Sequence, residues 1–208
     1  MSVNWDERYS DTEFAYGKEP NAFFKEWIDP LEPGKILMPA DGEGRNGVYA
    51  GTLGWKVTSF DLSREGKAKA LRLAKEWGVS MDYLVGDFSD LQFDKESFDA
   101  IGLIYAHFPA SKKSEFHKRL SSYLKPGGTV IFEAYSKKNL ELRKKNPRIG
   151  GPTDLDMLFS SDEIMKDFID YETIHMTEEK AVLEEGKYHQ GVGSVIRFVG
   201  RKRSFSIQ

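Results

Sequence analysis

The sequence predicts an α/β protein in which a doubly wound, mostly parallel sheet of seven strands carries helices on both faces. Three observations support this fold class. Short apolar runs that suit buried strands alternate with longer segments of helical periodicity. The first apolar run leads into a glycine-rich turn, residues 41–47. The last two runs are joined by so short a turn that they should form a hairpin, which makes the last strand antiparallel.

The composition indicates one domain. The chain has 208 residues, of which 39% are hydrophobic and 13% aromatic, enough for a sizeable core. We expect a single domain over 1–208, made of an aromatic leader (1–33) and a core (34–202) that includes a loop-rich insertion (135–159). The chain contains no cysteine, which excludes disulfides, thiolate zinc sites and a cysteine nucleophile.

Net charge and hydropathy limit the kinds of partner that the protein is expected to bind. The net charge of -3 gives no electrostatic footprint for nucleic acid. No stretch approaches the ~18 consecutive apolar residues of a membrane span, and the polar, acidic N-terminus is unlike a signal peptide. We therefore expect a cytoplasmic protein that binds neither nucleic acid nor membrane. The oligomeric state stays open.

The leader is unusually aromatic. Asn21 is placed to cap a helix that carries Phe23, Phe24 and Trp27 and that Pro30 ends. So apolar a segment must pack on the rest of the chain. Two interpretations stay open: the leader covers the sheet, or it forms a lid over a ligand with Tyr9 and Tyr16 lining it.

The remaining elements follow from periodicity and from turn and cap residues. A capping box, Ser160 to Glu163, predicts the start of one helix, and the segment after Gly200 is expected to fray. Strands are expected at 36–38, 57–60, 81–85, 98–104, 129–134, 171–183 and 191–200, and helices at 64–77, 111–124 and after 160.

A nucleotide site is predicted where the first strand, the glycine-rich turn, a helix and the second strand follow one another. Gly42 and Gly44 lack a Cβ and let the backbone approach a ligand, which the next helix meets with its free N–H groups. Asp61, at the tip of the second strand, can accept hydrogen bonds from both ribose hydroxyls. The run from Gly42 to Gly47 also matches the dinucleotide fingerprint G-x-G-x-x-G, so a nicotinamide cofactor is an alternative.

Further motifs favour a different cofactor. Asp87 in Gly86-Asp87-Phe88 can accept from an adenine amino group, and Phe88 can cover the ring. A Lys-Pro-Gly-Gly turn precedes the fifth strand, and a helix and a hairpin close the chain. From about Trp5 to Lys202 the chain thus resembles the Rossmann-like class I methyltransferases that use S-adenosylmethionine. It is most similar to small bacterial enzymes of the tellurite-resistance and thiopurine-methyltransferase type.

The resemblance implies S-adenosylmethionine as the cofactor and assigns roles to particular positions. Asp61 would hold the ribose and Asp87 the adenine, and Arg45 and the leader aromatics would approach the methionine end. The residues expected to contact the cofactor are Tyr9, Tyr16, Ala40, Asp41, Gly42, Gly44, Arg45, Asp61, Leu62, Gly86, Asp87, Phe88 and Tyr105.

The chain departs from the family pattern twice. Met38 stands where the family has an acid that helps anchor the cofactor's amino group, and Asp41 is a nearby substitute. Ala40 stands where the family has the first glycine of the turn. One extra methyl group is tolerable there if the φ angle of Ala40 is negative.

The acceptor should bind where the parallel strands end at their carboxyl edge. His107, after the fourth strand, is the candidate base, although it could instead be held by packing. Tyr135 and His189 are further candidate contacts for the acceptor. We expect His117 to be solvated on its helix and His175 to be structural. His107 and His189 alone make no metal site.

The predicted activity is methyl transfer to a small molecule through a sulfur, selenium, tellurium, oxygen or nitrogen nucleophile. An acceptor that is already anionic is slightly favoured, because no carboxylate is evident in the sequence to orient His107. Two alternatives stay open: an NAD(P)-dependent oxidoreductase, and a non-catalytic nucleotide-binding protein.

Overall fold

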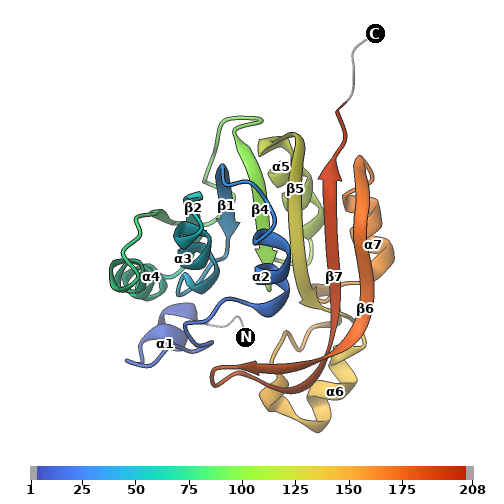
Figure 1. The fold of residues 1–208 in the computed structure, drawn as a ribbon. Coiled ribbons are helices and arrows are strands. Elements are labelled where there is room, and N and C mark those ends of the chain that lie inside the picture. Colours follow the sequence, from blue (N-terminus) through green and yellow to red (C-terminus); the bar gives the residue numbers. More distant parts are fainter. Residues whose placement is uncertain (1–3, 205–208) are drawn as a thin grey trace.

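The computed structural model describes residues 4–204 and confirms the predicted fold class (Figure 1). Seven strands form one sheet in the order β3-β2-β1-β4-β5-β7-β6. Every neighbouring pair is parallel except those of β7, which runs antiparallel to both β5 and β6. The strands are β1 Lys35–Pro39, β2 Lys56–Asp61, β3 Asp82–Val85, β4 Phe98–Ile104, β5 Leu124–Tyr135, β6 Tyr171–Glu185 and β7 His189–Lys202.

Helices cover both faces of the sheet. On one face α2 and α3 pack with Ile36, Met38 and Ile131 of the strands. On the other face α5 and α7 pack with an aromatic-rich core that includes Phe132 and Phe198. The helices are α1 Trp5–Tyr9, α2 Ala22–Ile28, α3 Arg45–Thr52, α4 Arg64–Glu76, α5 Lys113–Tyr123, α6 Asn139–Lys145 and α7 Ser161–Asp167, with 3-10 turns η1 Pro147–Ile149 and η2 Leu155–Met157. Among residues 4–204, no helix is long and apolar enough to span a bilayer.

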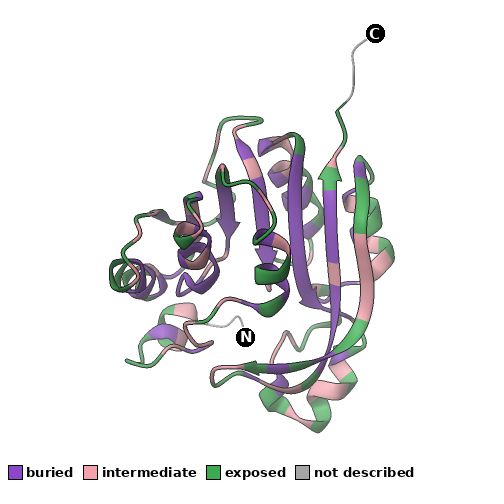
Figure 2. Cartoon of the chain, viewed as in Figure 1, coloured by how far each residue is buried: buried purple, intermediate pink, exposed green. Residues whose placement is uncertain are grey.

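The predicted helix caps form as expected. The Asn21 side chain accepts a hydrogen bond from the backbone N–H of Phe24 (2.9 Å), which starts α2. Ser160 and Glu163 exchange the two reciprocal hydrogen bonds of a capping box at the start of α7. Figure 2 shows the result of this packing: the central strands are almost wholly buried, and exposure concentrates on the outer helices and on β6.

The segment 135–159 is more structured than the expected insertion. It contains α6, η1 and η2, and it buries Ile149 and Leu158 against Leu183 and Val195 of the final hairpin. That hairpin is also longer than predicted, since β6 and β7 pair as far as Glu185 and His189. The pairing of β5 with β7 stops at Tyr135, so the hairpin tip projects beyond the sheet and curls towards α1 (Figure 1). At the other end, Arg201 and Lys202 belong to β7, and the end of the segment expected to fray, 205–208, lies outside the described residues.

His117 corrects one prediction. We expected it to be solvated, but its side chain is fully buried and its Nδ1 lies 2.8 Å from Oδ2 of Asp167. Its ring is stacked between Phe159 and Phe168. The amphipathic pattern of α5 gave no sign of this, because the covering residues come from α7 and the loop before it.

Ala40 corrects a second prediction. Its φ angle is +52°, in the left-handed region that glycine adopts without a steric cost. The turn therefore keeps the backbone conformation of a glycine although the chain has alanine.

Replacing Ala40 with glycine should stabilise the protein by about 1 kcal/mol, because it removes the clash between Cβ and the backbone. Urea unfolding measures the change in free energy. Ala68→Gly, at an exposed position of α4, is the matched control and should cost about 1 kcal/mol. A loss of stability in both variants would contradict strain at Ala40.

Candidate active site

The site lies where the direction of winding reverses. β2 and β3 extend the sheet to one side of β1, whereas β4 and β5 extend it to the other. In such sheets ligands bind beyond the carboxyl ends of the strands at this switch point. Ala40 follows β1 and Tyr105 follows β4 here, and both have a positive φ angle, +52° and +51°. Strained non-glycine residues of this kind cluster at functional sites.

Asp61 lies beside the glycine-rich turn, as the sequence predicted. Its Oδ2 accepts a hydrogen bond from the backbone N–H of Gly42 (3.0 Å) and its Oδ1 accepts one from Ser63 (2.9 Å). Burial raises the pKa of this carboxyl group, whereas the two backbone donors act to lower it. Each oxygen retains a further lone pair. The side chain is therefore held in place and can still accept hydrogen bonds from a ligand.

Gly42 and Gly44 of the turn allow two different close contacts. A Cβ on Gly44 would lie 2.5 Å from the Cβ of Ala70, so Gly44 lets the turn pack closely on α4. A Cβ on Gly42 would lie 2.5 Å from the hydroxyl of Tyr9, which is itself buried. Tyr9 thus covers the turn at the point where a cofactor would approach the backbone.

Ion pairs and hydrogen bonds tie the leader to the glycine-rich turn and to α4. Lys69 of α4 forms a buried ion pair with Glu43 (2.6 Å), and Glu43 also accepts a hydrogen bond from the backbone of Ala15 (2.8 Å). Lys69 donates a second hydrogen bond to the carbonyl of Glu13 (2.5 Å). The leader therefore packs against the glycine-rich turn and α4, which agrees with both interpretations, and its opening as a lid stays a prediction.

The expected adenine side is only partly as predicted. Asp87 is exposed just beyond β3, and its hydrogen bond from Ser89 (2.7 Å) lowers the pKa of its carboxyl group. Leu62 is 56% exposed, and a Cβ on Gly86 would meet only Leu91 at 3.5 Å, so both leave room for a ligand. The prediction that Phe88 covers the adenine ring is wrong.

Phe88 belongs to the hydrophobic core and does not cover a ligand site. It is 3% exposed and stacks on Phe60 with ring centroids 5.1 Å apart. The guanidinium group of Arg119 lies 4.0 Å from its ring centroid. These neighbours come from β2 and α5, which the local motif could not show.

Asp41 does not replace the missing acid of the first strand. Its Oδ2 accepts a hydrogen bond from Ser59 (2.7 Å) and its Oδ1 one from the backbone of Gly47 (3.4 Å), which joins the turn to β2 and α3. Burial raises the pKa of Asp41 to about 7. Its carboxyl group is thus engaged within the turn.

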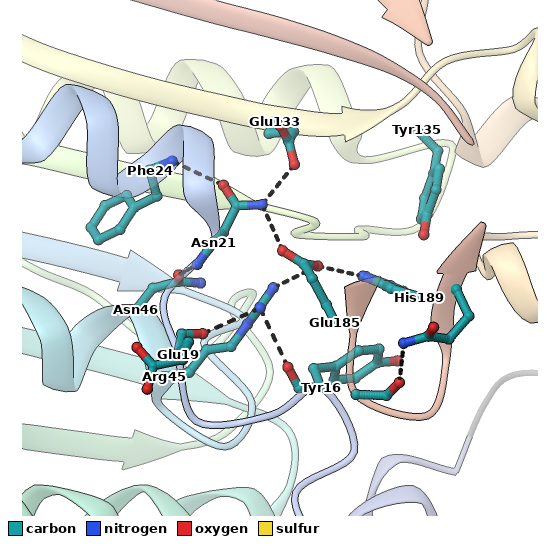
Figure 3. A network of polar contacts seen from close by, with 12 residues as sticks. Tyr16, Glu19, Asn21, Phe24, Arg45, Asn46, Glu133, Tyr135, Glu185 and His189 are labelled. Carbon is teal, nitrogen blue, oxygen red and sulfur yellow. Dashed lines mark hydrogen bonds and ion pairs between the residues drawn. The ribbon is translucent and has the colours of Figure 1, made fainter. Parts of the chain in front are cut away.

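A buried polar network occupies the other half of the site (Figure 3). Oε2 of Glu185, at the end of β6, lies 2.9 Å from Nη2 of Arg45 and 2.8 Å from Nδ1 of His189. Its Oε1 accepts from the side chain of Asn21 (3.0 Å). Burial acts to raise the pKa of Glu185, but Arg45 and His189 lower it to about 2. Glu185 therefore joins the leader, the glycine-rich turn and the hairpin through one carboxylate.

A second carboxylate lies next to it. Glu133, near the end of β5, is 1% exposed and accepts from Asn21 (2.7 Å) and from Nε of Arg197 (2.5 Å). Asn21, which the sequence showed only as a helix cap, thus donates to both glutamates. No local motif indicated Glu133, Glu185 or Arg197 as site residues. Only the hairpin register that pairs Glu185 with His189 could have indicated the contact between those two side chains.

Aromatic rings and two histidines gather beside this network. His189 is 5% exposed and contacts Tyr16 and Tyr105, with ring centroids 4.5 and 4.6 Å apart. His107 stacks on Tyr135, and burial lowers the pKa of His107 to about 4. Three of these side chains were predicted acceptor contacts, His107, Tyr135 and His189, and the fold brings them together.

Not every polar atom of this cluster has a partner. The Tyr135 hydroxyl donates to the carbonyl of Ile149 (2.6 Å). Within residues 4–204, the buried hydroxyl of Tyr105 and the buried Nδ1 of His107 have no hydrogen-bond partner. Unpaired buried polar atoms are rare in folded proteins, and these two lie among the predicted acceptor contacts. The cluster is therefore the candidate acceptor site.

The residues present fit an S-adenosylmethionine site. The turn has glycine where a Cβ would block the approach, the acid at the end of β2 keeps free lone pairs, and the neighbouring network offers both charges to an amino acid group. Fold and site together resemble those of class I methyltransferase domains. The comparisons with known proteins agree with this class.

Residues 36–128 match the family model described as a methyltransferase domain. Sterol methyltransferase-like 1 of Botryococcus braunii is 32% identical over 120 residues, which are 55% of this chain and 31% of that protein. TehB from Haemophilus influenzae superposes with a TM-score of 0.72 at 17% identity, over 96% of this chain and 66% of TehB. A structure solved in work on the conversion of a disulfide bond into a thioacetal group during echinomycin biosynthesis gives a TM-score of 0.75 at 17% identity, covering 98% and 92%.

These findings confirm the resemblance to class I methyltransferases, TehB included. Residues 36–128 therefore resemble a methyltransferase domain, and S-adenosylmethionine is the cofactor of that class. The chain spans less than a third of the length of the curated relatives it matches, 31%, 22% and 31%.

Proposed function

We propose that this protein transfers a methyl group from S-adenosylmethionine to a small-molecule acceptor. The observation that carries the proposal is the meeting of two half-sites at one edge of the sheet. Asp61 and the glycine-rich turn form the half that suits a nucleoside. Beyond the switch point, Tyr105, His107, Tyr135 and His189 form a half that suits an acceptor.

His189 is the better candidate base. When bound, the cofactor supplies a methyl group on a sulfonium whose sulfur leaves as a neutral thioether. Glu185 holds Nδ1 of His189 at 2.8 Å, whereas Nε2 makes no hydrogen bond within the described residues. A neutral His189 can therefore accept at Nε2 the proton that a thiol, phenol or amine loses as it gains the methyl group. His107 lacks such an orienting carboxylate.

Ligand binding tests the cofactor. S-adenosylhomocysteine should raise the melting temperature of the protein, and NAD should leave it unchanged. A shift with NAD alone would support the oxidoreductase alternative. Turnover of methyl-labelled S-adenosylmethionine on a panel of thiols, phenols, amines, selenite and tellurite then tests activity. Binding without turnover on any acceptor would support a non-catalytic role.

His189→Ala should lower kcat/KM by roughly 10²–10⁴ on an acceptor that loses a proton, the usual effect of removing a placed base. Burial, the first cause, lowers the pKa of His189 below 6.5, so it is neutral at pH 7. The wild-type rate should therefore rise as the pH increases towards 6.5 and level off above it, and the variant should lose this limb. The pH–rate profiles of both proteins measure this.

His107→Ala is the comparison variant for that experiment, because His107 lies in the same aromatic cluster without a carboxylate partner. We expect its pH–rate profile to keep the limb of the wild type. The assignment is wrong if His107→Ala loses the limb and His189→Ala keeps it. An anionic acceptor that needs no base would show no such limb in any of the three proteins.

A further inference from the structure

We propose that the buried ion pair of Arg45 and Glu185 is the receptor for the amino acid end of S-adenosylmethionine, in place of the first-strand acid that this chain lacks. This inference rests on the proposed function. It assigns the charged α-carboxylate of the cofactor to Arg45 and the ammonium group to Glu185.

Position 38, where the family has the acid, is not part of the site. Met38 is 1% exposed and lies under α2 in the core with Phe24. A Cβ on Gly102 of β4 would lie 2.7 Å from Sδ of Met38 and 2.9 Å from the Phe24 ring. The space at position 38 is thus filled by apolar packing, and the ammonium group needs a carboxylate from elsewhere.

The other acids near the switch point are engaged or more deeply buried. Asp41 is engaged by Ser59 and Gly47 within the turn. Glu43 is engaged by Lys69 and the backbone of Ala15. Glu133 is paired with Arg197 and its side chain is 1% exposed, whereas the side chain of Glu185 is 15% exposed. Glu185 is the acid that remains at the switch point.

Arg45 and Glu185 lie at the glycine-rich turn and have hydrogen-bonding capacity to spare. Arg45 lies within the glycine-rich turn as the first residue of α3, and Glu185 reaches it from the hairpin tip (Figure 3). Arg45 has five N–H donors, and its contacts to the carbonyls of Tyr16 and Glu19 are long, 3.4 Å each. Glu185 accepts three hydrogen bonds, from Asn21, Arg45 and His189, and a carboxylate has about four lone-pair positions.

The charges of Arg45 and Glu185 match those of an amino acid group. A buried pair that loses one partner leaves an uncompensated charge, which is strongly destabilising. A zwitterionic amino acid group brings one charge of each sign, so it can bind between Arg45 and Glu185 without changing the net charge of the site. The pair therefore suits this ligand group better than it suits a simple cation or anion.

Calorimetric titration of two ligands tests the inference. S-adenosylhomocysteine carries the amino acid group, and 5′-methylthioadenosine has the same nucleoside without it. Glu185→Gln should weaken S-adenosylhomocysteine binding about 10- to 100-fold, as expected for lost hydrogen bonds to a charged group, and should change methylthioadenosine binding less than about 3-fold. Glu179→Gln, which alters an exposed carboxylate on the same strand, is the matched control and should change neither.

A ligand that lacks the amino group tests the inference even if Glu185→Gln folds poorly. The wild type should bind the analogue of S-adenosylhomocysteine that lacks the amino group about 10-fold or more weakly than S-adenosylhomocysteine itself. Equal binding of these two, unchanged S-adenosylhomocysteine affinity in a folded Glu185→Gln, or an equal loss of both nucleosides in that variant would overturn the inference. A wild type that binds none of the ligands would instead contradict the proposed function.

Discussion

Asp61→Ala is expected to weaken binding of S-adenosylhomocysteine by about 30-fold or more, equivalent to about 2 kcal/mol, since hydrogen bonds to a charged group are worth ~1.5–3 kcal/mol each. The carboxylate is already oriented by the backbone of Gly42 and Ser63, so no ordering has to occur when the ribose binds. The fold should survive, because the acid lies at the end of β2. Calorimetric titration measures the affinity.

Asp82→Ala is the control for this experiment, because Asp82 is an exposed aspartate at the opposite end of the neighbouring strand β3. It should leave the affinity unchanged. Unchanged affinity in Asp61→Ala, with normal stability, would remove the ribose role from Asp61.

Lys69→Met is expected to have the largest effect on stability, a loss of about 3–5 kcal/mol in the free energy of unfolding. The two side chains of the Lys69–Glu43 pair are 6% and 3% exposed, so the variant leaves the Glu43 carboxylate buried without its counterion. It also removes the hydrogen bond from Lys69 to Glu13 that holds the leader. Urea unfolding gives the free energy, and amide exchange should show faster exchange in the leader around residues 13–15.

Lys18→Met is the matched control. The Lys18–Glu76 pair has a similar distance, 2.7 Å, but its side chains are 42% and 50% exposed, so breaking it should cost about 0–1 kcal/mol. Similar losses in the two variants would show that burial of the Lys69–Glu43 pair does not set its contribution.

The sequence by itself determined the features that short-range geometry fixes. The order of strand, glycine-rich turn, helix and strand placed Asp61 beside Gly42, because the parallel strands on either side of the turn end at the same edge of the sheet. Asn21 and Ser160 marked helix starts, because a cap depends on backbone groups two or three residues away. The short final turn likewise predicted the antiparallel strand.

Only the tertiary structure decided the environments of single side chains. Phe88 and His117 are buried by residues of other elements. Ala40 has a positive φ angle because the turn imposes the backbone conformation of a glycine at this position. Asn21, Arg45 and the hairpin tip with Glu185 and His189 are far apart in the chain, and they meet because the hairpin register and the position of the leader bring them to one point. A local pattern carries no information on such contacts, since burial and pairing depend on which distant elements pack together.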